Sequence, residues 1–276
     1  MKIIRFLFFL CIVFFLAFFF SGGTEVFQPD TLSNIRQTAE SFMDRTPSGK
    51  AGSSTPGTST TEDIHTVSPL DRLSRAVFLK SAVDAKVHKE HYVTVDQMSP
   101  ELRQAVLAIE DNRFYSHHGF DPEAIMRAAL VNLQYGQIEE GASTITQQLV
   151  KNMFLSHEQS FGRKAEEFAL ALDMELHYSK DEILALYLNT IYFGSNYYGI
   201  YDASMGYFGK KPKDLALPEA AMLAGLPNAP SLYSPYVDFL MAKKRQFVVL
   251  DAMVRTGYIS KDIAEDAKIK PIYLDH

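Results

Sequence analysis

EDNRFYSHHGF (residues 110–120) and GASTITQQLVKN (residues 141–152) are the two segments from which the fold and chemistry of this chain can be inferred. The first places two acids, Glu110 and Asp111, beside an arginine, aromatic residues and a pair of histidines. The second consists largely of small, hydroxyl and amide side chains. Burying so many polar groups in one short region costs free energy unless they have partners or a function. A carboxylate beside such a polar surface is what proton transfer on a sugar or a phosphate requires.

The pattern around these segments predicts a mainly α-helical domain. Ser99 and Pro100 are typical of a helix start, with serine as the N-cap and proline in the first turn. The apolar face of this helix leads directly to Glu110, which should lie at its C-terminal end. Ser179 to Glu182 form a capping box that starts another helix. Further helices are expected over residues 124–133, 163–176, 203–208, 218–224 and 239–255, and one short strand pair within residues 84–97.

Length and composition bound the class of protein. The chain has 276 residues, enough for one large domain or two small ones, and its 47% hydrophobic content can fill a core. A net charge of -6 argues against general nucleic-acid binding, which requires a basic surface. The single cysteine, Cys11, excludes an intrachain disulfide. The sequence has no internal repeat, no βαβ alternation and no glycine-rich phosphate loop of the P-loop or Rossmann kind.

The N-terminus predicts a membrane anchor. No polar side chain occurs from Phe6 to Phe20, and with the two preceding isoleucines the run approaches the ~20 residues that a helix needs to cross a bilayer. A cleaved signal peptide is the alternative, but the apolar run is long and the SGG sequence after it is a weak cleavage site. Lys2 and Arg5 precede the run, so the positive-inside rule places the N-terminus in the cytoplasm and the rest outside.

Composition then divides the chain into three parts. Residues 1–21 are the expected transmembrane anchor. Residues 22–68 are the expected flexible linker, because the stretch TPSGKAGSSTPGTSTTED has almost no apolar side chain to bury. Residues 69–276 are the expected globular domain.

Glu110 is the leading candidate for acid–base chemistry. A carboxylate beside buried surface tends to have a raised pKa, which suits a general base or acid. A solvated acid at a helix end is the simpler interpretation, but the residues that follow favour a function. Arg113 is expected either to orient Glu110 or Asp111 as an ion-pair partner or to lie at the surface. His117 and His118 lack a second His or Cys pair at metal-ligand spacing, so structural hydrogen bonding is favoured over a metal site.

The second segment offers groups that can hold a phosphate. Lys151 can meet a phosphate as a point charge. A helix N-cap followed by an ordinary helix would explain the same composition, and both interpretations can hold at once. The neutral donors are Ser143, Thr144, Gln147 and Gln148, of which the first two are the candidate N-caps.

RKAEE (163–167) adds two cations and two acids within one helical turn. Alone, such a run most often forms a solvated helix face. Glu167 shares its face with Ala171 and Met174, however, so its side chain is expected to point inward.

Together, these segments resemble the peptidoglycan glycosyltransferase family, whose members polymerise lipid II as domains of bifunctional penicillin-binding proteins or as monofunctional enzymes. The resemblance covers roughly residues 85–255. It implies a mainly α, lysozyme-like, two-lobed glycosyltransferase domain with an N-terminal transmembrane helix. The ordered segments that carry it are EDNRFYSHHGF, GASTITQQLVKN, RKAEE, KDEILALYLN (180–189) and RQFVVL (245–250), and LPEAAMLAGLPNAPSLYSP (217–235) is also similar to the family.

The resemblance implies roles for two glutamates. Glu110 corresponds to the general base, which deprotonates the 4-hydroxyl of an acceptor GlcNAc for attack on the anomeric carbon of the donor MurNAc. The lipid diphosphate leaves, and a β-1,4 bond forms with inversion. Glu167 corresponds to a second glutamate near the diphosphate, acting directly or through a divalent cation, Mg²⁺ or Mn²⁺. Because a whole sugar must fit between them, we expect the two carboxyl groups to be at least about 6.5–9.5 Å apart.

The remaining matches are to substrate-binding and structural positions. Asn189 and Arg245 match positions that look structural. Gln159 stands where relatives commonly carry a basic residue, which removes one charge-assisted contact worth about 1.5–3 kcal/mol. The substrate-binding matches are Asp111, Arg113, Ser143, Thr144, Gln147, Gln148, Lys151, Asn152, Arg163 and Lys164.

The implied setting is the extracytoplasmic face of the bacterial inner membrane. The expected partners are lipid II, the growing glycan strand and other cell-wall synthesis proteins, with no nucleic acid. An apolar patch near residues 125–135 either enters the bilayer or is ordinary core. The chain stops at His276 without a Ser-x-x-Lys domain, so it is expected to be monofunctional. Two alternatives remain: a lysozyme-like lytic enzyme, which would not need the cations, and an inactive membrane-anchored scaffold.

Overall fold

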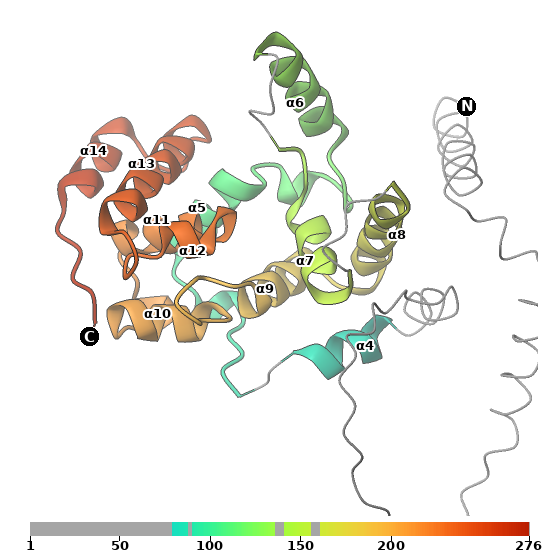
Figure 1. Ribbon diagram of the computed structural model, residues 1–276, viewed down its shortest axis with the longest axis horizontal. Coiled ribbons are helices and arrows are strands. Elements are labelled where there is room, and N and C mark those ends of the chain that lie inside the picture. Colours follow the sequence, from blue (N-terminus) through green and yellow to red (C-terminus); the bar gives the residue numbers. More distant parts are fainter. Residues whose placement is uncertain (1–78, 88–89, 136–140, 156–160, 276) are drawn as a thin grey trace, which may run out of the picture. The chain divides into compact units, whose positions relative to one another are not determined.

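The computed structural model describes residues 79–87, 90–135, 141–155 and 161–275 (Figure 1). The expected anchor and linker, and Gln159, lie outside these residues. None of the helices described here is both long and apolar enough to cross a membrane. The chain divides into two compact units, residues 78–158 with 166–276, and residues 1–77 with 159–165. The account of packing below concerns the first of these, the larger unit.

Three helices form the centre of one group: α5 (Pro100–Glu110), α11 (Leu217–Gly225) and α13 (Phe239–Arg255). Each packs against the other two. Every residue of α11 is buried except its first, so this helix lies inside the group. The helices α12 (Pro230–Tyr233) and α14 (Lys261–Ile269) pack against α13.

A second group carries the middle of the chain. Helix α7 (Ile145–Phe154) packs on α9 (Lys180–Thr190), which also contacts α10 (Ile200–Phe208). Helix α8 (Phe161–His177) begins in the smaller unit and continues into the larger one. The other elements are α4 (Leu79–Lys86) and the short 3-10 helices Val95–Gln97, Phe114–Ser116, Pro212–Asp214 and Leu226–Asn228.

The predicted helix starts at Ser99 and Ser179 are confirmed, because both side chains cap the first turn of their helices. The Ser99 hydroxyl accepts from the backbone N–H of Leu102 at 3.1 Å, and Pro100 occupies the first turn. Ser179 and Glu182 form the expected capping box. These caps satisfy backbone donors that a helix start otherwise leaves without partners. Helices α4 and α14 are additional to those predicted.

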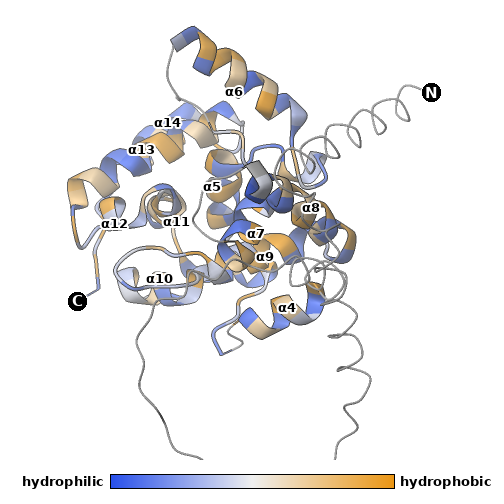
Figure 2. Cartoon of the chain, turned by 45° about the vertical axis from the view of Figure 1, so that its right-hand side comes forward, coloured by the Kyte–Doolittle hydropathy of each residue, from blue (hydrophilic) through white to orange (hydrophobic). Residues whose placement is uncertain are grey.

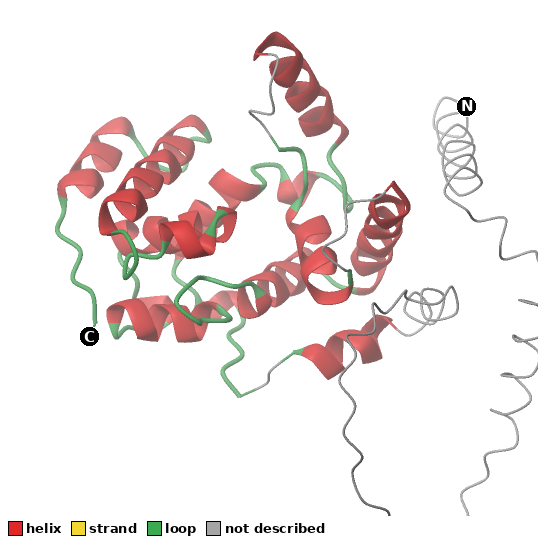
Figure 3. Cartoon of the chain, in the orientation of Figure 1, coloured by secondary structure: helices red, strands yellow, loops and turns green. Residues whose placement is uncertain are grey.

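The strand pair predicted within residues 84–97 is wrong. The described part of the chain contains no strand, only an isolated bridge between Tyr192 and Tyr198 (Figure 3). At Val93, a side chain takes the place of a neighbouring strand. The Oδ1 atom of Asn189 accepts from the Val93 N–H at 2.9 Å, and its Nδ2 donates to the Val93 carbonyl at 2.7 Å. Asn189 therefore has the structural role that its sequence match suggested.

Helix α6 (Pro122–Tyr135) differs from the others because it projects from them (Figures 1 and 2). Of its residues, only Ala128 is buried. Its large apolar side chains are open to solvent, with exposed fractions of 63% for Leu130 and 80% for Leu133. The interpretation of residues 125–135 as ordinary core is therefore wrong.

Candidate active site

Glu110 is the last residue of α5, and its side chain is half-buried. The Gln148 amide Nε2 donates to Glu110 Oε2 at 2.8 Å. On the far side of that amide, the Tyr187 hydroxyl donates to Gln148 Oε1 at 3.2 Å. Three helices thus contribute one polar side chain each to a connected row that ends on a carboxylate.

The pKa of Glu110 is raised above its ordinary value, chiefly because burial disfavours the charged carboxylate. The Gln148 hydrogen bond and the positive charges of Arg245 and Lys151 oppose this shift, and the neighbouring Asp111 adds to it. A raised pKa makes the carboxylate a stronger base, which suits a group that accepts a proton.

Asp111 has a different role from its neighbour. It is 8% exposed, and both its oxygens lie 3.0 Å from His117 Nε2. Its Oδ2 also accepts from the backbone N–H of Ile145, at 3.1 Å. Asp111 therefore ties segment 110–120 to the start of α7, and a direct contact with substrate stays a prediction. The expected structural hydrogen bonding by one histidine is confirmed for His117, whereas His118 is exposed.

Gly119 brings the same segment against two more elements. Its φ of +82° lies in the region that favours glycine, and an added Cβ would lie 3.0 Å from the backbone oxygen of Ala171 in α8. Its carbonyl accepts from the buried Thr144 hydroxyl at 2.7 Å. Segment 110–120, α7 and α8 therefore meet at a residue that must lack a side chain.

Thr144 and Gln147 are used within the fold. Thr144 is the N-cap of α7, and its hydroxyl accepts from the Gln147 N–H at 3.2 Å. The Gln147 side chain accepts in turn from the Thr144 N–H at 3.1 Å, and both side chains are buried. The helix-cap interpretation is therefore confirmed for Thr144. Ser143, just before the cap, is exposed, and its contact with a phosphate stays a prediction.

Arg113 does not orient Glu110 or Asp111, the first of the two expected roles. Its Nε lies 3.0 Å from Asp121 Oδ2, and its Nη1 pairs with Glu123. Asp121 is 2% exposed and caps α6 by accepting from the N–H groups of its first turn. Arg113 therefore fixes the start of α6, and the pattern of charges alone could not choose between these partners.

The remaining predicted residues differ in exposure. Glu167 is 2% exposed, so the inward direction expected from its helix face is confirmed. Lys151 and Asn152 are exposed at the C-terminal part of α7. Arg163 and Lys164 lie in the first turns of α8 and belong to the smaller unit.

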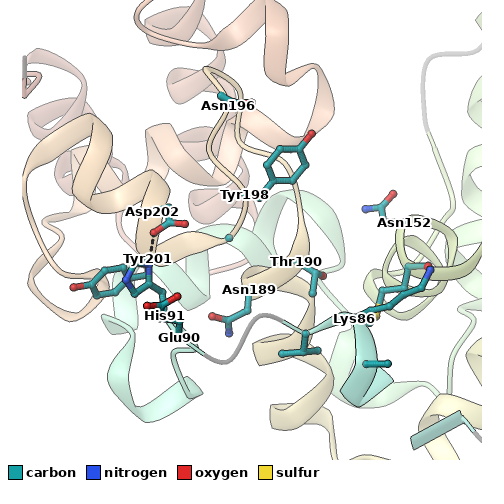
Figure 4. Close-up of a pocket in the computed structure, with 14 residues that line it drawn as sticks. Lys86, Glu90, His91, Asn152, Asn189, Thr190, Asn196, Tyr198, Tyr201 and Asp202 are labelled. Atoms are coloured by element: carbon teal, nitrogen blue, oxygen red, sulfur yellow. Dashed lines mark hydrogen bonds and ion pairs between the residues drawn. The ribbon is translucent and has the colours of Figure 1, made fainter. Parts of the chain in front are cut away.

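A pocket of about 750 Å³ opens beside the last turn of α7 (Figure 4). Asn152 and Lys86 line one side of it. The other side carries His91, whose Nδ1 lies 2.7 Å from Asp202 Oδ1 and whose ring is tilted by 34° against that of Tyr201, with the centroids 4.6 Å apart. Asn152 is one turn further along α7 than Gln148, so the pocket begins about 6 Å along the helix from the Glu110 contact.

Two residues near Glu110 were not predicted as part of the site. Tyr187 lies in the apolar run ILALYLN and looks like ordinary core, although a buried tyrosine hydroxyl needs a partner. Arg245 was expected to be structural, and its Nε does donate to the Gly225 carbonyl at 3.3 Å. Its charge nevertheless acts on Glu110 more strongly than that of Lys151.

Comparison with known proteins identifies a family model, similar sequences and a solved structure. Residues 77–254 match the family model described as Transglycosylase. A provisionally named transglycosylase of Cupriavidus necator is 42% identical over 193 residues, which are 70% of this chain and 83% of that protein. Penicillin-binding protein 1A of Escherichia coli is 48% identical over 180 residues, 65% of this chain and 21% of that protein. A crystal structure of penicillin-binding protein 1A from Haemophilus influenzae aligns with 67% of this chain and 18% of that chain, with 26% identity and a TM-score of 0.41. The chain thus spans about a fifth of the length of these two penicillin-binding proteins.

Proposed function

This chain belongs to the transglycosylase family, and we propose that it polymerises glycan strands of peptidoglycan from lipid II. The reaction transfers a glycosyl group, with inversion, from an undecaprenyl-diphosphate-linked disaccharide to the 4-hydroxyl of an acceptor GlcNAc. The observation that carries the proposal is the Glu110 carboxylate, half-buried at the end of α5 and held by Gln148.

In this mechanism Glu110 is the general base. It removes the proton from the acceptor hydroxyl as the oxygen attacks the anomeric carbon of the donor. Its raised pKa supports the role, because a base with a pKa nearer the working pH accepts the proton more readily. The leaving diphosphate needs no proton, so one base is sufficient.

Lys151 is the cation of the larger unit that is proposed to hold the diphosphate. It is exposed at the end of α7, within electrostatic reach of Glu110, and Ser143 is a neutral donor before the same helix. Arg163 and Lys164 belong to the smaller unit, and their contact with the diphosphate stays a prediction from the family resemblance. Fixed positive charge stabilises the charge that develops on the departing phosphate oxygens.

A divalent cation at Glu167 would supply further stabilisation of that charge when bound. The described residues contain no group of three His, Cys, Asp or Glu side chains that could hold a metal ion. Mg²⁺ is commonly bound by one or two carboxylates together with substrate phosphates and water. In such an arrangement Glu167, which is 2% exposed, would be the protein ligand.

We further propose a lysozyme-like, two-lobed domain at the extracytoplasmic face of the inner membrane, anchored by residues 1–21. Exposed apolar side chains along α6 support contact with the bilayer, because a lipid surface would cover what the protein leaves open. Such a position would let the lipid tail of the donor stay in the membrane during transfer.

The test is a lipid II polymerisation assay with the full chain, with and without divalent cation. Glu110→Gln should lower the rate about 10²–10⁴-fold, the usual contribution of a general base. Glu167→Gln should reduce the rate and weaken its dependence on the cation. Release of fragments from polymeric glycan would instead indicate a lytic enzyme, and a correctly folded wild-type protein without either activity would indicate a scaffold.

A further inference from the structure

Tyr187 is the first of three side chains linked by hydrogen bonds, followed by Gln148 and Glu110. It lies in the middle of α9, is completely buried, and is surrounded in sequence by buried aliphatic residues. Its hydroxyl donates to Gln148 Oε1 at 3.2 Å. Burial and the negative charges of Glu110 and Asp111 raise its pKa well above the ordinary value, so it keeps its proton and remains a donor.

The ionised Glu110 carboxylate only accepts hydrogen bonds, so it fixes which end of the Gln148 amide faces it, and the Tyr187 hydroxyl binds the other end. An amide has one oxygen and one nitrogen end, so a donor that faces the oxygen leaves the nitrogen for the other neighbour. With the Tyr187 hydroxyl on Oε1, the Gln148 Nε2 faces Glu110 Oε2, at 2.8 Å. In the reverse orientation, the amide oxygen would face the carboxylate and repel it.

The other charges around Glu110 come from different elements. Arg245 on α13 and Lys151 on α7 favour the ionised carboxylate, whereas the adjoining Asp111 disfavours it. Of the neutral groups, Gln148 makes the strongest interaction that favours the ionised form. The orientation of one amide therefore decides whether the nearest polar group stabilises or destabilises the base.

We propose that Tyr187 is a positioning residue for the glycosyl transfer: by donating to Oε1 it holds the Gln148 amide in the place from which Nε2 donates to the Glu110 base. The inference rests on the proposed role of Glu110. Tyr187 itself does not touch substrate. Its contribution is to hold the carboxylate in the form that can accept the acceptor's proton.

The test uses Tyr187→Phe in the full chain, with Tyr207→Phe as the matched control. Tyr207 is also completely buried, but its hydroxyl donates to the Phe193 carbonyl and lies 3.0 Å from Ser234 Oγ, away from Glu110. Both variants remove one buried hydroxyl. Only the first should alter the pH dependence of kcat/KM for lipid II.

The expected result follows from the sign of the interaction. Without the tyrosine donor, Gln148 stabilises the carboxylate less, so the pKa of Glu110 rises. The acidic limb of the pH profile should then move to higher pH by on the order of half to one unit. Activity on the high-pH plateau and KM should stay close to those of the wild type. An unchanged acidic limb, or an equal shift in Tyr207→Phe, would overturn the proposal.

A double substitution checks the route through Gln148. Gln148→Met removes the amide at similar length, so adding Tyr187→Phe to it should give no further shift. Additive shifts would show that Tyr187 does not act through this amide.

A carbon-13 NMR titration of the glutamate side chains separates this proposal from the proposed function. The Glu110 signal is assigned by its loss in Glu110→Gln. Its pKa should be higher in Tyr187→Phe than in the wild type, whether or not the protein polymerises lipid II. An unchanged titration would overturn the positioning role alone, while a wild type without polymerisation would overturn only the proposed function.

Discussion

Helices α7 and α6 are both rich in apolar side chains, yet α7 is mostly buried and α6 is mostly exposed. Seven of the ten residues of α7 are buried, including Thr146 and Gln147. Of the fourteen residues of α6, one is buried. The difference does not lie in apolar content but in whether other helices cover the apolar face. One helix is fixed by packing, and the other presents its apolar side chains to whatever lies outside.

This difference matches what each helix carries. In the proposed mechanism Gln148, which contacts Glu110, needs a fixed position, because a hydrogen bond to the base loses its effect when the groups move apart. Packing of α7 on α9 provides that rigidity. No equivalent demand acts on α6, whose proposed role is to contact lipid.

The largest expected difference is in stability. Leu149→Ala in α7 removes a completely buried side chain and should lower the free energy of unfolding by about 2–5 kcal/mol. Leu133→Ala in α6, where the side chain is 80% exposed, should change it by no more than about 0.5 kcal/mol. Urea denaturation of the two variants measures both values. Equal losses would mean that α6 is packed as tightly as α7.

A smaller effect should come from Glu110 itself. Its pKa is raised in the folded protein, so the folded state binds the proton more tightly than the unfolded chain. Stability therefore falls as pH rises from the unfolded pKa to the folded pKa, by about 1.4 kcal/mol for each unit between them. Glu110→Gln should be more stable than the wild type above this window and lose the advantage below it. Denaturation at pH 4 and pH 8 checks the sign, and a variant that is less stable at pH 8 would contradict it.

The cap at the start of α7 should make a smaller contribution to the free energy of unfolding than Glu110 does. Thr144→Ala removes the hydroxyl that caps the helix and donates to Gly119, and should cost about 1 kcal/mol, in a range of 0.5–2. Ser143→Ala, at the exposed position before the cap, is the comparison and should cost less. Thermal unfolding of both variants measures the two losses of stability. A larger loss of stability for Ser143→Ala would mean that the helix cap lies one residue earlier.

The smallest expected effect on the protein comes from a single tryptophan in α6, which reports whether this helix contacts lipid. The chain has no tryptophan, so a single Trp gives an unambiguous fluorescence signal. With Leu133→Trp in liposomes, emission should shift to shorter wavelength and be quenched by brominated lipids. Ile269→Trp at the end of α14, where the side chain is 82% exposed, is the control and should stay in water. Identical spectra from the two positions would exclude lipid contact by α6.

Much of the helical fold could be predicted because local signals agreed with the packing. Helix α13 has the predicted bounds, Phe239–Arg255, and begins after the Asp238 cap. The starts at Ser99 and Ser179 depend on side chains a few residues apart, which a sequence displays directly. The strand pair could not be judged in this way, because the partner of Val93 is a side chain 96 residues away.

The sequence predicted which residues belong to the candidate site better than it predicted which side chains contact one another. Glu110 was identified from its position at a helix end and from the segment that follows it. The direction in which Arg113 points depends on where α6 begins, which the charges alone do not reveal. Tyr187 was missed because its function depends on a hydroxyl that meets another helix only after folding.

The pairing of Asn189 with Val93 also bears on the order in which the molecule assembles. Closing a loop of 96 residues costs about 4 kcal/mol of chain entropy, by the logarithmic dependence on loop length. Two hydrogen bonds cannot offset that cost alone, so they should form only after α9 has docked on α7. We therefore expect the stretch that leads into α5 to join the fold late, when Val93 and Val95 become buried in the core.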